Sequence, residues 1–259
     1  MSGKLLRSAA VFSSMTFLSR LSGLVRDQVY AHVFGASAMM DAFFVAFRIP
    51  NFMRRLSAEG SFSMAFVPVL AEYKTTRSAD EVKALVDRVA GTLAAALLVL
   101  TAIVILLAGP IARLIAPNFD DVQMAILTDL LRITFPYALF ISLASLAGAI
   151  LNSYQRFAIP ALSPILLNVA MISAALAAKG WFDSSVMVLG WGVFIAGVLQ
   201  LGFQLPSLFR LGLLPRPRLD VAHAGVRRIM TLMVPTLFGS SVAQFNLLLN
   251  TWVATLLIS

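Results

Sequence analysis

The sequence contains no cysteine, and only 12% of its 259 residues are charged. The absence of cysteine excludes disulfide bonds, cysteine-ligated metals and iron–sulfur clusters. The low charge content excludes an ordinary soluble domain, in which about 25% of residues are charged. Apolar side chains are instead in excess, at 59% of the residues. A soluble core cannot bury such a proportion, so the composition predicts an integral membrane protein.

Several enzyme motifs are also missing. The sequence has no glycine-rich phosphate-binding loop, no metal-binding His–Glu pattern and no Ser–His–Asp candidate set. Its two histidines, His32 and His223, have no second ligand at a spacing that suits a metal. We therefore predict a protein that is not an enzyme and that needs no cofactor and no bound metal.

The formal net charge of the chain is +8. A basic protein is often a nucleic-acid-binding protein. Here, however, most lysines and arginines lie between long apolar segments rather than on a soluble face. Positive charge beside membrane spans is the expected topology signal. The sequence therefore predicts no nucleic-acid partner.

Charge-free windows locate the membrane spans, since a helix needs about 20 mainly apolar residues to cross the hydrocarbon layer. Such windows lie at 88–113, 132–156, 156–179, 183–210 and 228 to the end. Two earlier segments, 8–35 and 41–73, are also long enough but contain charges. A segment in lipid must satisfy its own backbone hydrogen bonds. We therefore predict seven membrane spans, all of them α-helical.

Lysine and arginine are distributed unequally between the two ends of these spans. With the amino terminus in the cytoplasm, the outer side receives Arg113, Arg132 and Lys179. The inner side receives a larger set, namely Lys4, Arg7, Lys74, Arg77, Lys83, Arg88, Arg156, Arg210, Arg216, Arg218, Arg227 and Arg228. Connections rich in lysine and arginine stay in the cytoplasm. We therefore predict a multi-pass membrane protein with a cytoplasmic amino terminus.

The longest polar connection covers residues 209–228 and contains two prolines, which disfavour a continuous helix. Its second half has a pattern typical of a helix that lies along the membrane surface. We therefore divide the chain into a six-helix bundle over 1–208, a cytoplasmic linker over 209–228 and a seventh helix over 229–259. The sequence stops at Ser259 in an apolar run without a charged flank, so we expect a fragment of a longer protein.

The first span carries charges within its apolar stretch. An ionisable residue at the bilayer centre costs about 2.5–3.5 kcal/mol, so several together must face protein, water or a ligand. Arg20 and Asp27 lie seven residues apart and share one helix face, as do Ser19 and Arg26. This spacing predicts that the first helix borders a polar cavity.

The second span carries more charges, on both sides of a proline. Asp41 and Arg48 share a helix face before it. Arg55 and Glu59 stand at positions i and i+4 after it, while Arg54 points elsewhere. We expect these side chains to extend the polar surface that begins on the first helix.

Pro50 and Gly60 are expected to interrupt the second span, and broken helices at membrane depth occur where they line a cavity. Across the two spans five arginines exceed four acids, which are Asp27, Asp41, Glu59 and Glu72. A surplus of guanidinium groups suits an anion. Arginine is the expected residue for a phosphate, because its planar fork binds two oxygens and stays charged.

Other interpretations of these charges stay open at this point. Arginines near helix ends can extend to lipid headgroups, and Arg–acid pairs can serve only to hold helices together. Asp27 either neutralises a neighbouring arginine or contacts the ligand. Asp129 and Arg132 stand at positions i and i+3, and we predict an ordinary surface pair there.

The sequence resembles the MurJ (MviN) family of bacterial lipid II flippases, within the MOP exporter superfamily. The resemblance rests first on SRLSGLVRDQVYAHVFGAS and DAFFVAFRIPNFMRRLSAEGSFSMAFVPVLAEYK, which are similar to the start of the family. Further matches are ITFPYALFISLASLAGAILNSYQRFAIPALSPILLN and GVLQLGFQLPSL, so the resemblance covers essentially the whole chain. It implies two six-helix lobes that face each other across a central cavity, plus two further helices. This chain would supply the first lobe, the linker and the first helix of the second lobe.

The resemblance also implies roles for individual residues. The family's cavity arginines match Arg20, Arg26 and Arg54, and its functional first-lobe acid matches Asp41; these four are the predicted substrate-binding residues. Glu59 matches an acid of the family's gate region. The residues predicted to gate or support the cavity are Ser19, Asp27, Arg48, Arg55, Glu59 and Pro50. The second lobe, with its own cavity arginine and a cation site in some members, is missing.

The function that the resemblance implies is transport of lipid II, an undecaprenyl-pyrophosphate-linked disaccharide-pentapeptide. The carrier would move it from the cytoplasmic to the outer leaflet of the bacterial inner membrane by alternating access. Lipid II and membrane lipids are the expected partners. Coupling to the membrane potential or to a cation, and contact with the cell-wall synthesis machinery, stay open. The alternatives are a related exporter of drugs or polysaccharide-lipids and a membrane scaffold that transports nothing.

Overall fold

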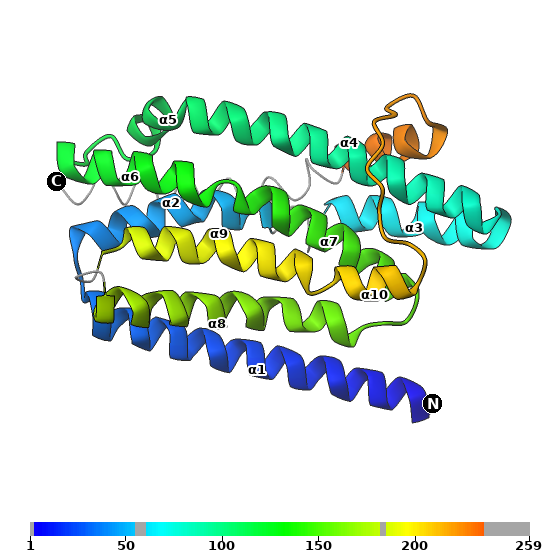
Figure 1. Cartoon of the computed structure of the whole chain (residues 1–259), viewed down its shortest axis with the longest axis horizontal. Coiled ribbons are helices and arrows are strands. Elements are labelled where there is room, and N and C mark those ends of the chain that lie inside the picture. The colour runs from blue at the N-terminus through cyan, green and yellow to red at the C-terminus, as the bar shows by residue number, and fades with distance from the viewer. Residues whose placement is uncertain (1–2, 55–60, 182–184, 236–259) are drawn as a thin grey trace.

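The computed structural model describes residues 3–54, 61–181 and 185–235, and the regular elements within these ranges are all α-helices. The long helices lie side by side along one axis (Figure 1). The first half of the chain forms α1 (Gly3–Phe34), α2 (Ala38–Arg54), α3 (Ser61–Thr76), α4 (Ala79–Leu106) and α5 (Ala108–Ile115). The second half forms α6 (Asp121–Thr134), α7 (Tyr137–Ser153), α8 (Ala158–Trp181), α9 (Met187–Gly202) and α10 (Leu205–Arg210). A last helical stretch covers 224–235.

Two large apolar cores and a smaller one around Phe135 hold the described helices together. α1 packs along α8, α8 along α9, and α2 against α6. The core between them is built around buried rings such as Tyr30, Phe43 and Tyr137. The second core joins α3, α4 and the end of α7, with Phe66 and Leu85 fully buried. The helices of the first core, among them α1, α2, α7 and α8, also surround the cavity described below.

Four helical segments are long and apolar enough to cross a membrane: Ala79–Leu106, Asp121–Ser153, Ala158–Trp181 and Met187–Arg210. They correspond to four of the predicted charge-free windows. Their outer faces are apolar, since Leu98 and Ile103 of α4 and Trp191 and Ile195 of α9 are each about half exposed. Apolar faces of this size are stable against lipid and not against water. The chain is therefore a multi-pass membrane protein, as its composition predicted.

Several predicted boundaries were wrong. The window 132–156 starts too late, because the α6–α7 segment begins at Asp121 and Arg132 lies within α6. That arginine is tolerated in the helix because it forms the predicted surface pair with Asp129, at 3.1 Å with both side chains about half exposed. The segment 41–73, predicted as one span with interruptions at Pro50 and Gly60, contains two described helices, α2 and α3, whose outer ends are Ala38 and Thr76.

The predicted interruption at Pro50 was also wrong. α2 continues through this proline to Arg54, and the proline ring is buried. Proline removes one backbone donor, but membrane helices tolerate this where neighbouring groups satisfy the freed carbonyl. Gly60, the second predicted interruption, lies outside the described residues.

The two ends of the bundle differ in their charge. The amino terminus, the α3–α4 connection, the α7–α8 connection and the chain after α10 lie at one end (Figure 1). These segments and the adjoining ends of α3 and α10 contain Lys74, Arg77, Arg156, Arg210, Arg216 and Arg218. The carboxyl ends of α1, α5 and α8 lie at the opposite end, where α5 and α8 contribute Arg113 and Lys179 in their last turns. The basic and less basic sides predicted from the sequence thus correspond to the two ends of the fold.

Residues 213–220, which we call the strap, have no regular secondary structure and lie against α4. The backbone N–H of Arg218 donates to the carbonyl of Asp87 at 3.0 Å, and the N–H of Arg216 donates to the Asp87 carboxylate at 2.7 Å. That carboxylate is buried and also pairs with Lys83 one turn away. The strap forms the middle of the predicted linker 209–228, and the helix over 224–235 begins before that linker ends. The division of the chain into bundle, linker and seventh helix stays a prediction, and residues 236–259 lie outside the described part.

Candidate functional site

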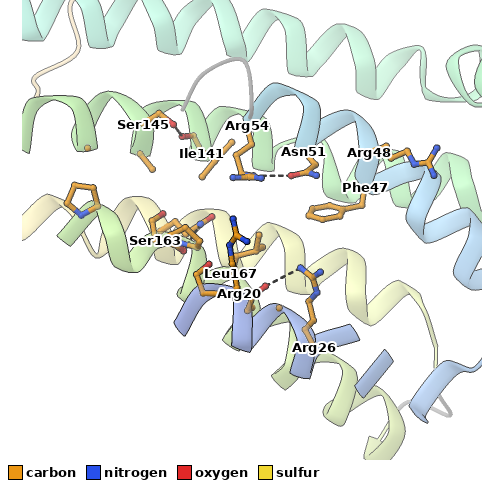
Figure 2. A pocket seen from close by; sticks show the side chains of 18 of the residues that line it. Arg20, Arg26, Phe47, Arg48, Asn51, Arg54, Ile141, Ser145, Ser163 and Leu167 are labelled. Carbon is orange, nitrogen blue, oxygen red and sulfur yellow. Dashed lines mark hydrogen bonds between the residues drawn. The ribbon is translucent and has the colours of Figure 1, made fainter. Parts of the chain in front are cut away.

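A cavity of about 1430 Å³ lies between α1, α2, α7 and α8. Among the described residues, its charged lining consists of Arg20, Arg26, Arg48, Arg54 and Asp41. Figure 2 shows Arg20 and Arg26 on the α1 wall and Arg54 on the facing wall, with their guanidinium groups directed into the space between. The cavity therefore brings together arginines of α1 and α2, of which Arg20 and Arg54 lie 34 positions apart in the sequence.

The α1 wall is one face of a continuous helix. Ser19, Arg20, Gly23 and Arg26 recur at helical spacing, and all of them line the cavity. Arg20 is exposed, and within the described part of the chain it makes no hydrogen bond or ion pair. Its guanidinium donors are consequently available to a molecule in the cavity.

Arg26 is held more firmly than Arg20. Its Nε and Nη2 atoms donate to Oδ1 of Asp27 at 3.0 and 2.7 Å, and Nη1 donates to Oδ1 of Asn168 at 3.1 Å. Its guanidinium carbon also lies 5.7 Å from the centroid of the Tyr30 ring. Charge-assisted hydrogen bonds of this kind fix the plane of a guanidinium group. Arg26 therefore presents a defined edge to the cavity.

The facing wall comes from α2. Asp41 and Arg48 both line the cavity, as expected from their shared helix face, and Asn51 and Arg54 follow one turn further on. The Nε atom of Arg54 donates to Oδ1 of Asn51 at 2.9 Å. This bond leaves the terminal nitrogens of Arg54 directed toward the α1 wall (Figure 2).

Positive charge dominates this space. Four guanidinium groups face one carboxylate, that of Asp41, among the described lining residues. Asp27 pairs with Arg26 but does not itself line the cavity. Even with Asp27 counted, cations exceed carboxylates. In a site of low dielectric constant such a surplus attracts an anion strongly, and planar guanidinium groups suit phosphate oxygens.

Neutral polar groups line the part of the cavity near α7 and α8. The Ser145 hydroxyl donates to the carbonyl of Ile141 at 2.7 Å, and Nε2 of Gln200 donates to the carbonyl of Ser163 at 2.7 Å. Ser163 and Asn152 also line this region. Hydroxyl and amide groups hold water and bind uncharged polar groups. The cavity thus offers a cationic region and a neutral polar region.

The structure brings most of the predicted site residues together. The predicted substrate-binding residues Arg20, Arg26, Arg54 and Asp41 line the cavity, as do Ser19 and Arg48 from the supporting set. Asp27 and Pro50 do not line it: the former contacts Arg26 and the latter is buried. Arg55 and Glu59 lie outside the described residues. Placement does not test the roles, which stay predictions.

Asn51 and Asn168 were not predicted from the sequence, because the predicted site was built mainly from charged residues. Asn168 lies in the middle of α8, in the charge-free window 156–179, and is 5% exposed. A carboxamide buried in an apolar span must find hydrogen-bond partners or lose free energy. This requirement was a usable signal that a polar surface faces α8.

Comparison with known proteins gives consistent matches. A family model described as lipid II flippase MurJ matches residues 30–259. The lipid II flippase MurJ of Burkholderia cenocepacia is 44% identical over 257 residues, which cover 97% of this chain and 50% of the relative. The probable lipid II flippase MurJ of Vibrio cholerae is 43% identical over 267 residues, covering 99% of this chain and 50% of the relative.

Structural comparison agrees with these matches. A solved structure of a lipid II flippase MurJ in an inward closed conformation superposes with a TM-score of 0.82 at 27% identity. The superposition covers 95% of this chain and 50% of that one. The chain therefore spans about half the length of the curated relatives that it matches.

Proposed function

Since this chain belongs to the lipid II flippase MurJ family, we propose that it forms one lobe of a two-lobed carrier that moves lipid II across the bacterial inner membrane. The observation that carries the proposal is the cavity in which four arginines face one carboxylate between apolar helices. Flipping a lipid breaks and forms no covalent bond, so the proposed activity needs no catalytic group in this cavity. The proposed activity is therefore transport without catalysis and without a cofactor.

The chemistry of lipid II matches the two regions of the cavity. Moving a diphosphate and a sugar–peptide head through hydrocarbon is prohibitively costly, because buried anions and sugars lose their water. Arg20, Arg26 and Arg54 bind the diphosphate from two walls, with Asp41 beside them. The neutral groups near Ser145 and Ser163 and the enclosed water surround the head, while the undecaprenyl tail remains in lipid.

Transport follows from alternating access of the cavity to the two sides of the membrane. Rocking of this lobe against the second lobe moves the opening from the cytoplasmic to the outer face. Release requires weaker binding in the outward state. Asp41 and Glu59 weaken substrate binding in the outward state by pairing with the arginines. The walls of the cavity are supported by Ser19, Asp27, Arg48, Arg55 and Pro50. The membrane potential, worth about 2.3 kcal/mol per charge per 100 mV, and a cation in the second lobe are the candidate sources of energy.

The proposed topology places the amino terminus in the cytoplasm. It is supported by the basic end of the bundle, which contains the amino terminus and the strap. Positively charged connections are retained on the cytoplasmic side. Six spans over 1–208 then form the first lobe, 209–228 the cytoplasmic linker, and 229–259 the first helix of the second lobe. Membrane lipids surround this assembly, and the cell-wall synthesis machinery is its natural protein partner.

Two rival functions fit the cavity less well. An exporter of cationic drugs needs an excess of acids at membrane depth, and the described lining has an excess of arginines. A scaffold in which charges only pair helices leaves Arg20 unexplained, since this side chain has no partner within the described residues. The substrate of a polysaccharide-lipid exporter also carries a diphosphate, so the cavity alone does not separate the two functions. The experiment below separates them.

The test is lipid II export by Arg20→Ala and Arg26→Ala variants of the native gene, in cells depleted of their own flippase. Each variant loses a charge-assisted contact with the diphosphate, and we expect export of lipid II to the outer leaflet to fall at least about tenfold. Arg132→Ala is the matched control, because this arginine pairs with Asp129 on the exposed surface of α6.

Export and membrane levels of the Arg132→Ala variant should equal those of the unchanged protein. Full export in both cavity variants would refute the assignment of the arginines. Failure of the unchanged gene to export lipid II, together with export of a polysaccharide-lipid, would support the related exporter instead.

A further inference from the structure

Asn168 of α8 makes an unusually complete set of hydrogen bonds for a side chain in an apolar helix. Its Oδ1 accepts from Nη1 of Arg26 at 3.1 Å. Its Nδ2 donates to the hydroxyl of Ser22 at 2.8 Å and to the carbonyl of Ser19 at 3.1 Å. The hydroxyl of Ser22 in turn donates to the same Ser19 carbonyl at 2.9 Å. One buried carboxamide thus joins α8 to both the backbone and the cavity arginine of α1.

The partners determine which way this carboxamide faces. A backbone carbonyl only accepts, so the atom beside Ser19 must be the nitrogen. A guanidinium group only donates, so the atom beside Arg26 must be the oxygen. The Ser22 hydroxyl both donates and accepts and is compatible with this arrangement. Rotating the amide by 180° would break the bonds to both Ser19 and Arg26, which locks the acceptor toward the arginine.

The bonds to Arg26 leave a defined part of its guanidinium group open. A guanidinium group has five N–H donors, one on Nε and two on each terminal nitrogen. Asp27 accepts from Nε and from Nη2, and Asn168 accepts from Nη1. One N–H on each terminal nitrogen is left without a partner within the described residues. These two open N–H groups lie on the two terminal nitrogens of Arg26, and N–H groups on these nitrogens can bind two phosphate oxygens.

We propose that Asn168 is a positioning residue for diphosphate binding, which orients the guanidinium group of Arg26 without neutralising it. The inference rests on the proposed function and deepens it. A carboxylate at position 168 would hold the arginine equally well but would cancel charge that the anion needs. A neutral amide supplies the same acceptor geometry and preserves the cationic surplus of the cavity.

The location of Asn168 in the fold supports this role. α1 and α8 form the most extensive helix pair in the described part of the chain, and Asn168 lies at their contact. Gly23, one turn before Arg26 on α1, would bring a Cβ atom to 3.7 Å from Nδ2 of Asn168. The backbone of α1 thus lies in ordinary van der Waals range of the amide at this point.

The test measures binding of undecaprenyl diphosphate to the full 259-residue chain in lipid nanodiscs. Asn168→Leu keeps the branched shape of the side chain but removes its hydrogen-bonding atoms, including the acceptor for Arg26. We expect its dissociation constant to rise about tenfold, the effect of one lost charge-assisted hydrogen bond. Asn168→Asp keeps the size and the acceptor and adds a negative charge, so its affinity should fall further than that of Asn168→Leu.

A double-mutant cycle distinguishes positioning from a general structural effect. In the Arg26→Ala background, Asn168→Leu should cause no further loss, because the group that it orients is gone. In the matched Arg20→Ala background, Asn168→Leu should retain its full effect, since Asn168 makes no hydrogen bond to Arg20 among the described residues.

Equal losses from Asn168→Leu in both backgrounds would overturn the inference, as would an Asn168→Asp variant that binds as well as the unchanged chain. The Asn168→Asp result decides the question if Asn168→Leu does not fold. If Arg26→Ala binds the diphosphate normally, the proposed function fails, and the inference fails with it. If Arg26→Ala weakens binding but the cycle is additive, only the inference fails.

Discussion

Arginine rather than lysine supplies the positive charge of the described cavity lining. A guanidinium group binds two oxygens with parallel hydrogen bonds and is less strongly hydrated than an ammonium group. Arg20 faces the cavity without a protein partner in the described part of the chain, so both edges of its fork are open to a ligand. The shape of the side chain should therefore matter in addition to its charge.

Arg20→Lys tests this point. The ammonium group keeps the charge but binds as a point donor, so we expect diphosphate affinity to lie between those of the unchanged chain and Arg20→Ala. A loss of roughly fivefold to tenfold relative to the unchanged chain corresponds to one weakened charge-assisted bond. Equilibrium binding of undecaprenyl diphosphate in nanodiscs measures it. Affinity equal to that of the unchanged chain would mean that charge alone is recognised.

Glycine is required at position 91 of α4 because the strap approaches α4 closely there. A Cβ atom at this position would lie 2.3–2.5 Å from the backbone N, C and O atoms of Arg218. No side chain fits at such distances, and backbone atoms cannot rotate away. The strap and α4 can therefore contact each other only through a glycine.

Gly91→Ala should detach or displace the strap and lower the free energy of unfolding by about 1–3 kcal/mol. The measurements are thermal denaturation in detergent and the rate of tryptic cleavage after Arg218, which should increase. Gly109→Ala on α5 is the matched control, because a Cβ atom there meets nothing within 4 Å. Unchanged stability and cleavage of Gly91→Ala would contradict the observed contact.

The start of α4 is stabilised by a capping box at the basic end of the bundle. The Ser78 hydroxyl accepts from the backbone N–H of Glu81, and the Glu81 carboxylate accepts from the N–H of Ser78 at 3.0 Å. The hydrogen bond from the Ser78 backbone, followed by that from its hydroxyl, lowers the pKa of Glu81 below its ordinary value of 4.5. Ionised Glu81 is therefore favoured by the folded helix.

This capping box predicts a pH dependence with a definite sign. The stabilisation from Glu81 is complete above pH 4.5 and is lost as the pH falls through the lower folded pKa, because the unfolded chain takes up the proton first. Glu81→Gln should keep the cap but remove this part of the pH dependence. Ser78→Ala should cost about 1 kcal/mol at neutral pH. Thermal denaturation between pH 3 and 7 measures both, and identical pH profiles for Glu81→Gln and the unchanged chain would contradict the account.

Among the secondary-structure elements, the long apolar helices were predicted well from the sequence and the shorter helices were predicted poorly. Charge-free windows found α4, α8 and the α9–α10 segment because lipid contact requires continuous apolar stretches. They misplaced the start of α6, because a surface pair with Asp129 lets Arg132 lie within a helix. The rule that proline ends a helix failed at Pro50, since packing in the bundle holds α2 together through it.

The candidate site of the whole molecule could be predicted only in part. Charges at helical spacing within apolar segments predicted the α1 face, because such charges must converge on a polar space. The contribution of α8 was not predicted, since Asn168 carries no charge and its partners are about 145 positions away in the sequence. The strap was missed for a similar reason, because its contacts to α4 use backbone N–H groups that no side-chain pattern records.

The proposed orientation of the molecule can be tested directly because the chain has no cysteine. Ala36 lies between α1 and α2, and Ala79 is the first residue of α4, at the opposite end of the bundle (Figure 1). Both residues are exposed, so each can be replaced by cysteine in a separate variant. A membrane-impermeant maleimide should label Ala36→Cys in intact cells and Ala79→Cys only after the membrane is opened. The reverse labelling pattern would contradict a cytoplasmic amino terminus.

The proposed function depends on diphosphate binding by guanidinium groups inside the membrane-spanning bundle. Its most direct test is equilibrium binding of undecaprenyl diphosphate to the chain in nanodiscs, with an Arg20→Ala/Arg26→Ala variant beside an Arg113→Ala/Arg132→Ala control of equal charge. We expect a loss of at least about a hundredfold for the first variant, from two charge-assisted contacts, and nearly unchanged affinity for the control. Equal affinities of the two variants would contradict it.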